Sequence, residues 1–170
     1  LNSIHNSFLD AIMQFASAKY TWIPLYLVVI FFIFKKFKLK KGLIVFILTI
    51  LAITLADQTS VHLFKNVFQR LRPCFNEDIK NIVYTISLPG GHYGFVSSHA
   101  ANSFAFAVFS SLFFQNKNYT IFILIWAFFV SYSRIYLGVH YPLDILGGAI
   151  LGSFISILLF NVSKKIIFSS

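Results

Sequence analysis

Long apolar runs constrain the fold of this chain more than any other feature. Four are clear, at residues 42–56, 100–114, 119–138 and 143–160, and a shorter fifth covers 21–34. A helix needs about 20 residues to cross roughly 30 Å of hydrocarbon, so the shorter runs must extend into aromatic and lysine-bearing flanks that suit the interface. The run that begins at residue 42 is expected to continue as a helix to Leu71. The pattern predicts an all-α, polytopic membrane helical bundle of about five spans.

The composition agrees with a membrane protein. Hydrophobic residues make up 58% of the chain and charged residues 11%, whereas soluble domains contain roughly 45–50% and about 25% of these classes. No Gly- and Ser-rich linker or internal repeat divides the sequence, so residues 1–170 are expected to form a single membrane domain. The one cysteine, Cys74, excludes an intramolecular disulfide and a Cys-rich metal site.

The N-terminal segment has a different pattern. Ile4, Phe8, Ile12, Phe15 and Ala16 recur at helical spacing, and polar residues occupy the opposite side. An amphipathic helix of this kind lies in the membrane interface rather than across the bilayer. We therefore expect one N-terminal interfacial helix in addition to the spans.

The lysines indicate the orientation of the spans. A net charge of +9 could suggest a nucleic-acid partner, but most lysines adjoin apolar runs. They lie between the first two runs and after the third and fifth, at Lys35, Lys36, Lys38, Lys40, Lys41, Lys117, Lys164 and Lys165. Cytoplasmic loops are enriched in Lys and Arg, so these segments are expected on the cytoplasmic side. Alternation then places residues 62–98 and 134–144 on the extracytoplasmic side.

The first polar cluster on that side runs from Lys65 to Pro73. Seven positions separate Lys65 from Arg72, which is almost two turns of a helix, so both cations are expected on one helical face. Pro73 would then end the helix. The alternative interpretation is a positively charged collar at the interface.

The second cluster, residues 90–99, directly precedes an apolar run. Ser97 is a good N-cap, and the free N–H groups of a helix start form an anion site. His99 would lie in the first turn and face a bound anion. His92 lies in the same loop and could contact substrate, although a mobile surface histidine is an alternative. A capped helix with an interfacial histidine also remains possible for the whole cluster.

The third cluster, residues 133–144, joins the last two apolar runs. Pro142 suits the first turn of a helix, and Asp144 would lie one turn after His140, where it can accept the ring N–H. An oriented imidazole beside Arg134 suits nucleophilic attack on phosphorus. The alternative is an interfacial ion pair between Arg134 and Asp144.

Two ionisable residues near these clusters can be interpreted either as functional or as structural. Asp57 and His62 lie toward the outer end of the second run. An ionisable residue at membrane depth is a functional candidate, but pairing with Lys65 or with a neighbouring helix is equally expected.

The last apolar run contains Gly148 and Gly152, four positions apart. Small residues at this spacing let membrane helices approach closely. We expect this face of the helix to pack against another span.

Together the three clusters resemble the type 2 phosphatidic acid phosphatase superfamily, which includes bacterial lipid phosphatases and vanadium haloperoxidases. Its first signature, Lys-x6-Arg-Pro, is matched at Lys65, Arg72 and Pro73. Its third, Ser-Arg-x5-His-x3-Asp, is matched at Ser133, Arg134, His140 and Asp144. Its second, Pro-Ser-Gly-His, is matched only at Ser97 and His99, because Val96 and Ser98 replace proline and glycine.

The resemblance implies how phosphate is bound. Lys65, Arg72 and Arg134 would neutralise the phosphoryl oxygens, and Ser97, Ser98 and the amides of the next turn would add donors. Glycine at the position of Ser98 permits close backbone approach, so Ser98 is expected to narrow that approach or slow turnover. No metal or other cofactor is expected, and the site should bind vanadate.

The resemblance also implies the catalytic roles. His140 would attack phosphorus in line, held in the required tautomer by Asp144. His99 would protonate the departing oxygen and then activate the water that hydrolyses the phosphohistidine.

The implied function is that of a membrane lipid phosphatase. Its partners would be the bilayer and a phosphorylated lipid: undecaprenyl diphosphate, lipid A, phosphatidylglycerol phosphate or phosphatidic acid. The expected location is the bacterial cytoplasmic membrane, with the active site on the extracytoplasmic face, and no nucleic acid is involved. Two alternatives stay open, a lipid phosphotransferase of the same superfamily and a non-catalytic lipid-binding membrane protein. The oligomeric state is not specified by the sequence.

Overall fold

The computed structural model describes residues 2–86 and 88–168, and this part of the chain is helical with no strand. The longer helices are α1 (Ser7–Ser17), α2 (Ile23–Thr59), α4 (Ser98–Phe114), α5 (Lys117–Tyr136) and α6 (Pro142–Phe168). A π-helical turn, η1 (Ser60–Lys65), joins α2 to α3 (Asn66–Phe68), and η2 (Pro73–Phe75) is a short 3₁₀ turn. The predicted all-α class is confirmed.

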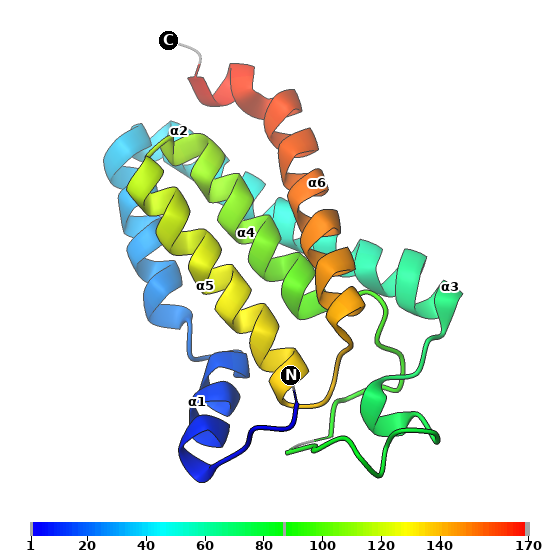
Figure 1. The fold of residues 1–170 in the computed structure, drawn as a ribbon. Helices are drawn as coiled ribbons and strands as arrows, with labels where there is room; N and C mark the ends of the chain where they lie inside the picture. The colour runs from blue at the N-terminus through cyan, green and yellow to red at the C-terminus, as the bar shows by residue number, and fades with distance from the viewer. Residues whose placement is uncertain (1, 87, 169–170) are drawn as a thin grey trace.

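Helix α2 contains a sharp break at Lys38. The backbone there has φ 57° and ψ −176°, which is not helical, and Figure 1 shows the chain reversing direction at this bend. The two arms correspond to the first two apolar runs. Gly42 lets them approach, because a Cβ at this position would lie 2.7 Å from Cδ1 of Phe34.

The second arm of α2 continues beyond Asp57, as predicted. Turn η1 and helix α3 carry the helical path to Phe68. Gln69 then adopts the left-handed conformation with φ 46°, which ends the helix. The predicted end at Leu71 was wrong by three residues. The expectation that Lys65 and Arg72 share one helical face was also wrong, because Arg72 follows this end with extended backbone.

Three helical segments in the described part are long and apolar enough to cross a membrane: Ile23–Phe68, Lys117–Tyr136 and Pro142–Phe168. The first includes both arms of α2, and α4 has only 17 residues. The molecule is an integral membrane protein, but the predicted count of about five spans is not confirmed.

Helix α4 lies at the centre and packs against α2, α5 and α6. The predicted close packing at Gly148 and Gly152 is confirmed, because a Cβ at Gly152 would lie 2.1 Å from the backbone oxygen of Ala101. Ser156 donates from its hydroxyl to the backbone oxygen of Ala105, at 2.8 Å. Small side chains therefore bring the backbones of α4 and α6 together.

Helix α1 packs on α5 at the end of the bundle that carries the long loops (Figure 1). The Asp10 carboxylate accepts a hydrogen bond of 2.7 Å from the Tyr136 hydroxyl. Phe8 and Phe15 point outward, and Ala16 is buried against the bundle. One part of the predicted apolar face is therefore exposed at the molecular surface, and another part packs on the protein. The interfacial position of α1 stays a prediction.

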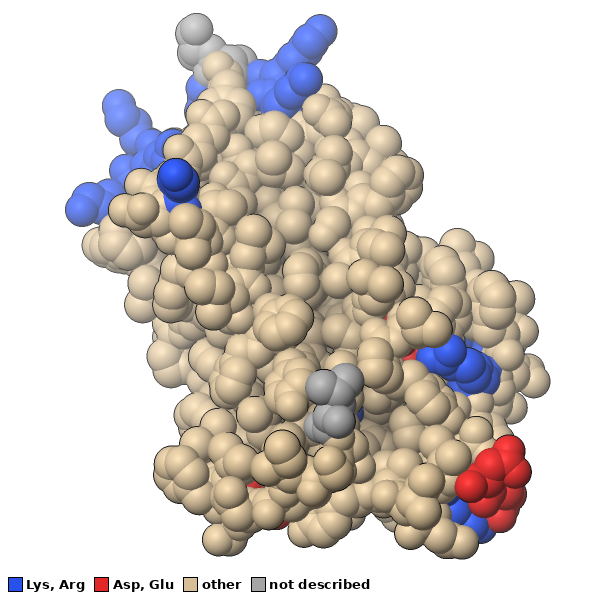
Figure 2. All heavy atoms as spheres, viewed as in Figure 1, with Lys and Arg blue, Asp and Glu red and all other residues tan. Residues whose placement is uncertain are grey.

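Charged residues gather at the two ends of the molecule. Figure 2 shows one group of basic side chains at the end where the C-terminus lies, near the bend of α2. The loops between residues 69 and 97 lie at the opposite end (Figure 1). The two ends are separated by a tan, mostly uncharged surface.

Candidate active site

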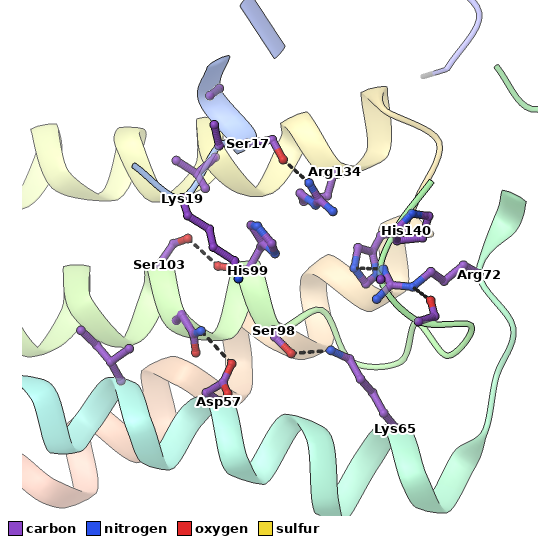
Figure 3. Close-up of a pocket in the computed structure, with 18 of the residues that line it drawn as sticks. Ser17, Lys19, Asp57, Lys65, Arg72, Ser98, His99, Ser103, Arg134 and His140 are labelled. Atoms are coloured by element: carbon purple, nitrogen blue, oxygen red, sulfur yellow. Dashed lines mark hydrogen bonds between the residues drawn. The ribbon is translucent and has the colours of Figure 1, made fainter. Parts of the chain in front are cut away.

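A pocket of about 770 Å³ opens among α2, α4, α5 and the loops at the end opposite the C-terminus. Seven of the nine predicted site residues line it, namely Lys65, Arg72, His92, Ser98, His99, Arg134 and His140. The other two, Ser97 and Asp144, are fully buried behind the lining. Segments that are far apart in the sequence thus meet in one cavity (Figure 3).

His140 lies in the short connection between α5 and α6 and is almost completely buried. Its Nδ1 is 3.2 Å from Oδ2 of Asp144, and its Nε2 is 2.6 Å from Nη1 of Arg72. A carboxylate can only accept and a guanidinium can only donate. These partners therefore assign the proton to Nδ1 and leave a lone pair on Nε2.

Burial sets the charge of His140. Removal from water disfavours the imidazolium and lowers the pKa of His140 to about 4, against the opposing influence of Asp144. The ring is neutral at physiological pH as a result. A neutral imidazole with an unprotonated Nε2 is the form that can act as a nucleophile.

The Asp144 carboxylate is held by three donors. Oδ2 accepts from the backbone N–H of Tyr141 at 2.9 Å as well as from His140, and Oδ1 accepts from the guanidinium of Arg70. The alternative ion pair with Arg134 is not formed, because Arg134 donates to the Ser17 hydroxyl instead. Asp144 is thus oriented toward the imidazole.

Gly94 lies directly against this pair. A Cβ there would lie 3.0 Å from Oδ2 of Asp144, 3.2 Å from Cγ of Arg72 and 3.6 Å from Nδ1 of His140. The loop can pass this closely because Gly94 has no side chain.

Three predicted cations face the pocket from different elements. Lys65 comes from η1, Arg134 from the last turn of α5 and Arg72 from the extended segment before η2. Arg72 is fixed by bonds from Nε to the Gly91 carbonyl (2.8 Å) and from Nη1 to the Val139 carbonyl (3.1 Å). Burial lowers the pKa of Arg72, yet an arginine remains protonated in proteins. The pocket therefore carries a concentrated positive charge.

The two serines at the start of α4 have different roles, one in capping the helix and one in lining the pocket. Ser97 caps α4 by accepting from the Ala100 N–H at 3.4 Å, and its own N–H donates to the Asp144 carbonyl at 3.0 Å. Ser98 faces the pocket, where its hydroxyl accepts from Lys65 and lies 2.7 Å from the Ser60 hydroxyl. The residue that replaces the family glycine is thus a partner of a cation. Val96, which replaces proline, is buried.

His99 and His92 occupy different parts of the pocket. His99 lies in the first turn of α4, and Figure 3 shows its ring close to Arg134. His92 lies at the exposed rim, where its ring packs on Phe75 with a centroid distance of 4.6 Å. Its backbone carbonyl accepts from the Arg72 N–H at 2.9 Å. The substrate contact of His92 stays a prediction.

The two less certain ionisable residues both have partners. Asp57 lines the pocket and accepts a 2.9 Å hydrogen bond from Nδ2 of Asn102 on α4, so pairing with a neighbouring helix is confirmed. Nε2 of His62 in η1 lies 3.2 Å from Oε1 of Gln58 in the preceding turn of α2.

Sequence reasoning missed three residues. Ser17 and Lys19 reach the pocket from the end of α1 and the following turn (Figure 3). They are distant in sequence from the clusters, so no local signal marked them. Arg70 lay inside the first cluster, but nothing in its spacing indicated a contact with Asp144.

The positive charge in the pocket comes from side chains that include those of Lys65, Arg72 and Arg134. Within residues 2–86 and 88–168, no group of three or more His, Cys, Asp or Glu residues could hold a metal ion. The arrangement provides a neutral imidazole, an oriented carboxylate, a second imidazole and several cations. These groups suit the transfer of a phosphoryl group, whose oxygens carry the charge that the cations neutralise.

Known proteins share this sequence pattern. Residues 42–168 match the family model of the PAP2 superfamily. The chain is 39% identical to the lipid A 4'-phosphatase of Bacteroides thetaiotaomicron over 97% of this chain and 74% of the relative. It is 36% identical to the lipid A 4'-phosphatase of Porphyromonas gingivalis, over 95% and 69%. An undecaprenyl-diphosphatase of Sulfolobus acidocaldarius is 37% identical, over 88% and 68%.

Solved structures share the fold. The crystal structure of a transmembrane PAP2 type phosphatidylglycerolphosphate phosphatase from Bacillus subtilis superposes with a TM-score of 0.77 at 23% identity, covering 99% of this chain and 83% of that one. That of Aquifex aeolicus LpxE gives 0.65 at 25% identity, over 94% and 90%. The matched family model covers most of the chain and spans all three clusters. This chain belongs to the PAP2 superfamily.

Proposed function

We propose that this membrane lipid phosphatase hydrolyses its substrate through a covalent phosphohistidine on His140. The observation that carries the proposal is the orientation of the imidazole. Asp144 holds Nδ1, so the lone pair of Nε2 faces a pocket that also presents Lys65, Arg72 and Arg134. Nucleophile, orienting carboxylate and charge-neutralising groups are thereby combined in one buried site.

The first chemical step forms a P–N bond. A phosphoryl group docking beside Arg72 would draw its guanidinium onto the phosphoryl oxygens, which frees Nε2 of His140 to attack phosphorus. The P–O bond to the lipid breaks, and its electron pair leaves on the lipid oxygen. The bound phosphoryl group would hold a proton on His99, and His99 would give this proton to the lipid oxygen, which makes that oxygen a better leaving group.

The second step reverses the roles. Neutral His99 takes a proton from water as the water oxygen attacks phosphorus. The P–N bond breaks, its electron pair returns to Nε2 of His140, and inorganic phosphate leaves. Asp144 stabilises the positive charge that the imidazole carries between the two steps, as a buried carboxylate does in other triads.

The apolar side of the same pocket suits a hydrocarbon chain. Its lining includes Trp22 just before α2, Tyr26 from α2, Phe106 from α4 and Val130 from α5. The Trp22 indole donates from Nε1 to the Ala16 carbonyl at 2.8 Å, which fixes this wall. A lipid could thus place its phosphate among the cations and its first methylene groups against these side chains.

We propose lipid A as the substrate, with removal of one of its phosphate groups. Support comes from the two lipid A 4'-phosphatases, which match nearly the whole chain. The undecaprenyl-diphosphatase relative makes that diphosphate the second candidate. The test is phosphate release from lipid A, undecaprenyl diphosphate, phosphatidylglycerol phosphate and phosphatidic acid in detergent with excess EDTA. We expect the highest kcat/KM for lipid A. Loss of all activity in EDTA, with recovery on addition of magnesium, would contradict the metal-independent mechanism.

We propose that the site faces away from the cytoplasm in the bacterial cytoplasmic membrane. The support is the separation of the pocket from the lysine-rich end, which the positive-inside rule assigns to the cytoplasm (Figure 2). Cys74 is half-buried, and burial raises the pKa of its thiol. The variant Cys74→Ser therefore provides a background for new cysteines. Glu77 and Lys117 are both exposed. The variant Glu77→Cys should react with an impermeant maleimide on intact cells, whereas Lys117→Cys should react only after lysis. The opposite labelling would invert the topology.

A further inference from the structure

Both carboxylate oxygens of Asp144 have separate tasks. Oδ2 accepts from His140 Nδ1 and the Tyr141 N–H, at 3.2 and 2.9 Å. Oδ1 accepts from Nη2 of Arg70. Because Asp144 is completely buried, its charge depends on these partners. Arg70 is the arginine that forms a salt bridge with this carboxylate.

Arg70 is itself held in place from two sides. Its guanidinium lies 5.0 Å from the ring centroid of Phe95 and 4.8 Å from that of Tyr141. Stacking of this kind suits the planar, delocalised charge of arginine. The Arg70 carbonyl also accepts from the Gly94 N–H at 2.8 Å, which ties its backbone to the loop that passes over Asp144.

Arg70 differs from the other arginines near the site. Arg72 and Arg134 line the pocket, whereas Arg70 does not. It approaches Asp144 through Oδ1, while His140 approaches through Oδ2. Its charge therefore acts on the carboxylate and not on a bound phosphoryl group.

We infer that Arg70 is a positioning residue for the nucleophile. Its ion pair fixes the rotation of the Asp144 carboxylate, so that Oδ2 faces Nδ1 of His140 and Nε2 points into the pocket. This inference rests on the proposed role of His140. By analogy, the residues that orient metal ligands commonly change activity by about 10–100-fold when they are removed.

The expected kinetic result follows from this geometry. Arg70→Gln removes the charge and should lower kcat by about 10–100-fold. The inhibition constant of inorganic phosphate should stay within about twofold, because Arg70 does not face the phosphate. Arg70→Lys keeps the charge but loses the planar stack, so it should recover only part of the kcat that Arg70→Gln loses. Lys80→Gln is the matched control, since Lys80 pairs only with exposed Glu77 at 2.5 Å in the described contacts.

A double-mutant cycle gives the decisive test. If Arg70 acts through Asp144, adding Arg70→Gln to Asp144→Asn should change kcat by less than about threefold, because two residues of one network are not additive. Multiplication of the two losses would overturn the inference, and so would wild-type kcat for Arg70→Gln. A purely structural role predicts equal losses in Arg70→Lys and a fall in thermal stability that accounts for the lost activity.

Failure of the proposed function gives a different result. In that case His140→Ala would retain turnover, whatever the Arg70 variants do. Thermal unfolding of each purified variant in detergent separates misfolding from loss of kcat. If Arg70→Gln does not fold, the cycle is run with Arg70→Lys, whose loss must again disappear in the Asp144→Asn background.

Discussion

Replacement of Asp144 by asparagine is predicted to remove the orientation of the nucleophile with little change in side-chain volume. The wild-type carboxylate receives donors at both oxygens, from Arg70 at Oδ1 and from His140 and Tyr141 at Oδ2. Asparagine has only one oxygen. If that oxygen faces His140, the amide NH₂ opposes the Arg70 guanidinium. If the NH₂ faces His140 instead, Nδ1 becomes an acceptor and Nε2 carries the proton.

Both orientations of the amide are unfavourable, and the second abolishes the nucleophilic lone pair. By analogy with other triads in which an aspartate orients a histidine, kcat should fall by about 10³–10⁴-fold. One lost hydrogen bond to a charged group should lower the free energy of unfolding by about 2 kcal/mol. The fold should therefore survive.

The assay is phosphate release from the best lipid of the panel, together with thermal unfolding in the same detergent. Glu77→Gln makes the same chemical change at an exposed carboxylate and serves as the control. A variant Asp144→Asn with kcat within about threefold of the wild type would refute the assigned tautomer. A variant that loses activity only in proportion to its unfolded fraction would refute it as well.

Three further outcomes are expected. Gly152→Ala should lower the free energy of unfolding by about 1–3 kcal/mol, because its Cβ would meet backbone atoms of α4. Gly90→Ala has open space around its Cβ and should leave thermal unfolding unchanged. Gly94→Ala should reduce kcat more than stability, since its Cβ would press on Asp144 and Arg72; equal kcat would contradict this. His140 is neutral when folded and takes up a proton below pH 6.5 when unfolded, so stability should fall by about 3 kcal/mol between pH 6.5 and 4. His140→Asn should lack that part of the pH dependence in unfolding experiments.

The sequence was sufficient for those features that depend on local patterns. Apolar runs identified the helical segments, and the fixed spacing of the third cluster predicted the contact between His140 and Asp144. The N-cap role of Ser97 followed from its place before an apolar run. The glycines at 148 and 152 marked the close packing of α6 on α4. In each case the determining interaction lies within a few residues or repeats with the period of a helix.

Other features depend on contacts between distant segments. No local rule ends a helix at Gln69, whose left-handed conformation sends Arg72 into an extended segment. That segment pairs with the loop around residue 93 through an isolated bridge between Leu71 and Tyr93. The pairing brings Arg70 to Asp144 across 74 positions of sequence, and a similar long-range packing brings Ser17 to Arg134.

The span count shows a different limit of sequence reasoning. Two apolar runs predicted two helices, but the chain between them remains helical except at Lys38. Lysine and phenylalanine are both compatible with a helix. The composition between the two runs therefore indicated a charged segment, but it could not show whether that segment is a loop or a helix. Helix α4, with 17 residues, is shorter than a typical span and packs among α2, α5 and α6.

The central claim is the covalent bond between phosphorus and Nε2 of His140. The most direct test incubates the purified enzyme with ³²P-labelled lipid substrate, stops the reaction in alkali, in which phosphohistidine is stable, and maps the label by mass spectrometry. We predict label on the peptide that contains His140, and none in His140→Ala. Turnover without labelled His140, or label on another residue, would contradict the account.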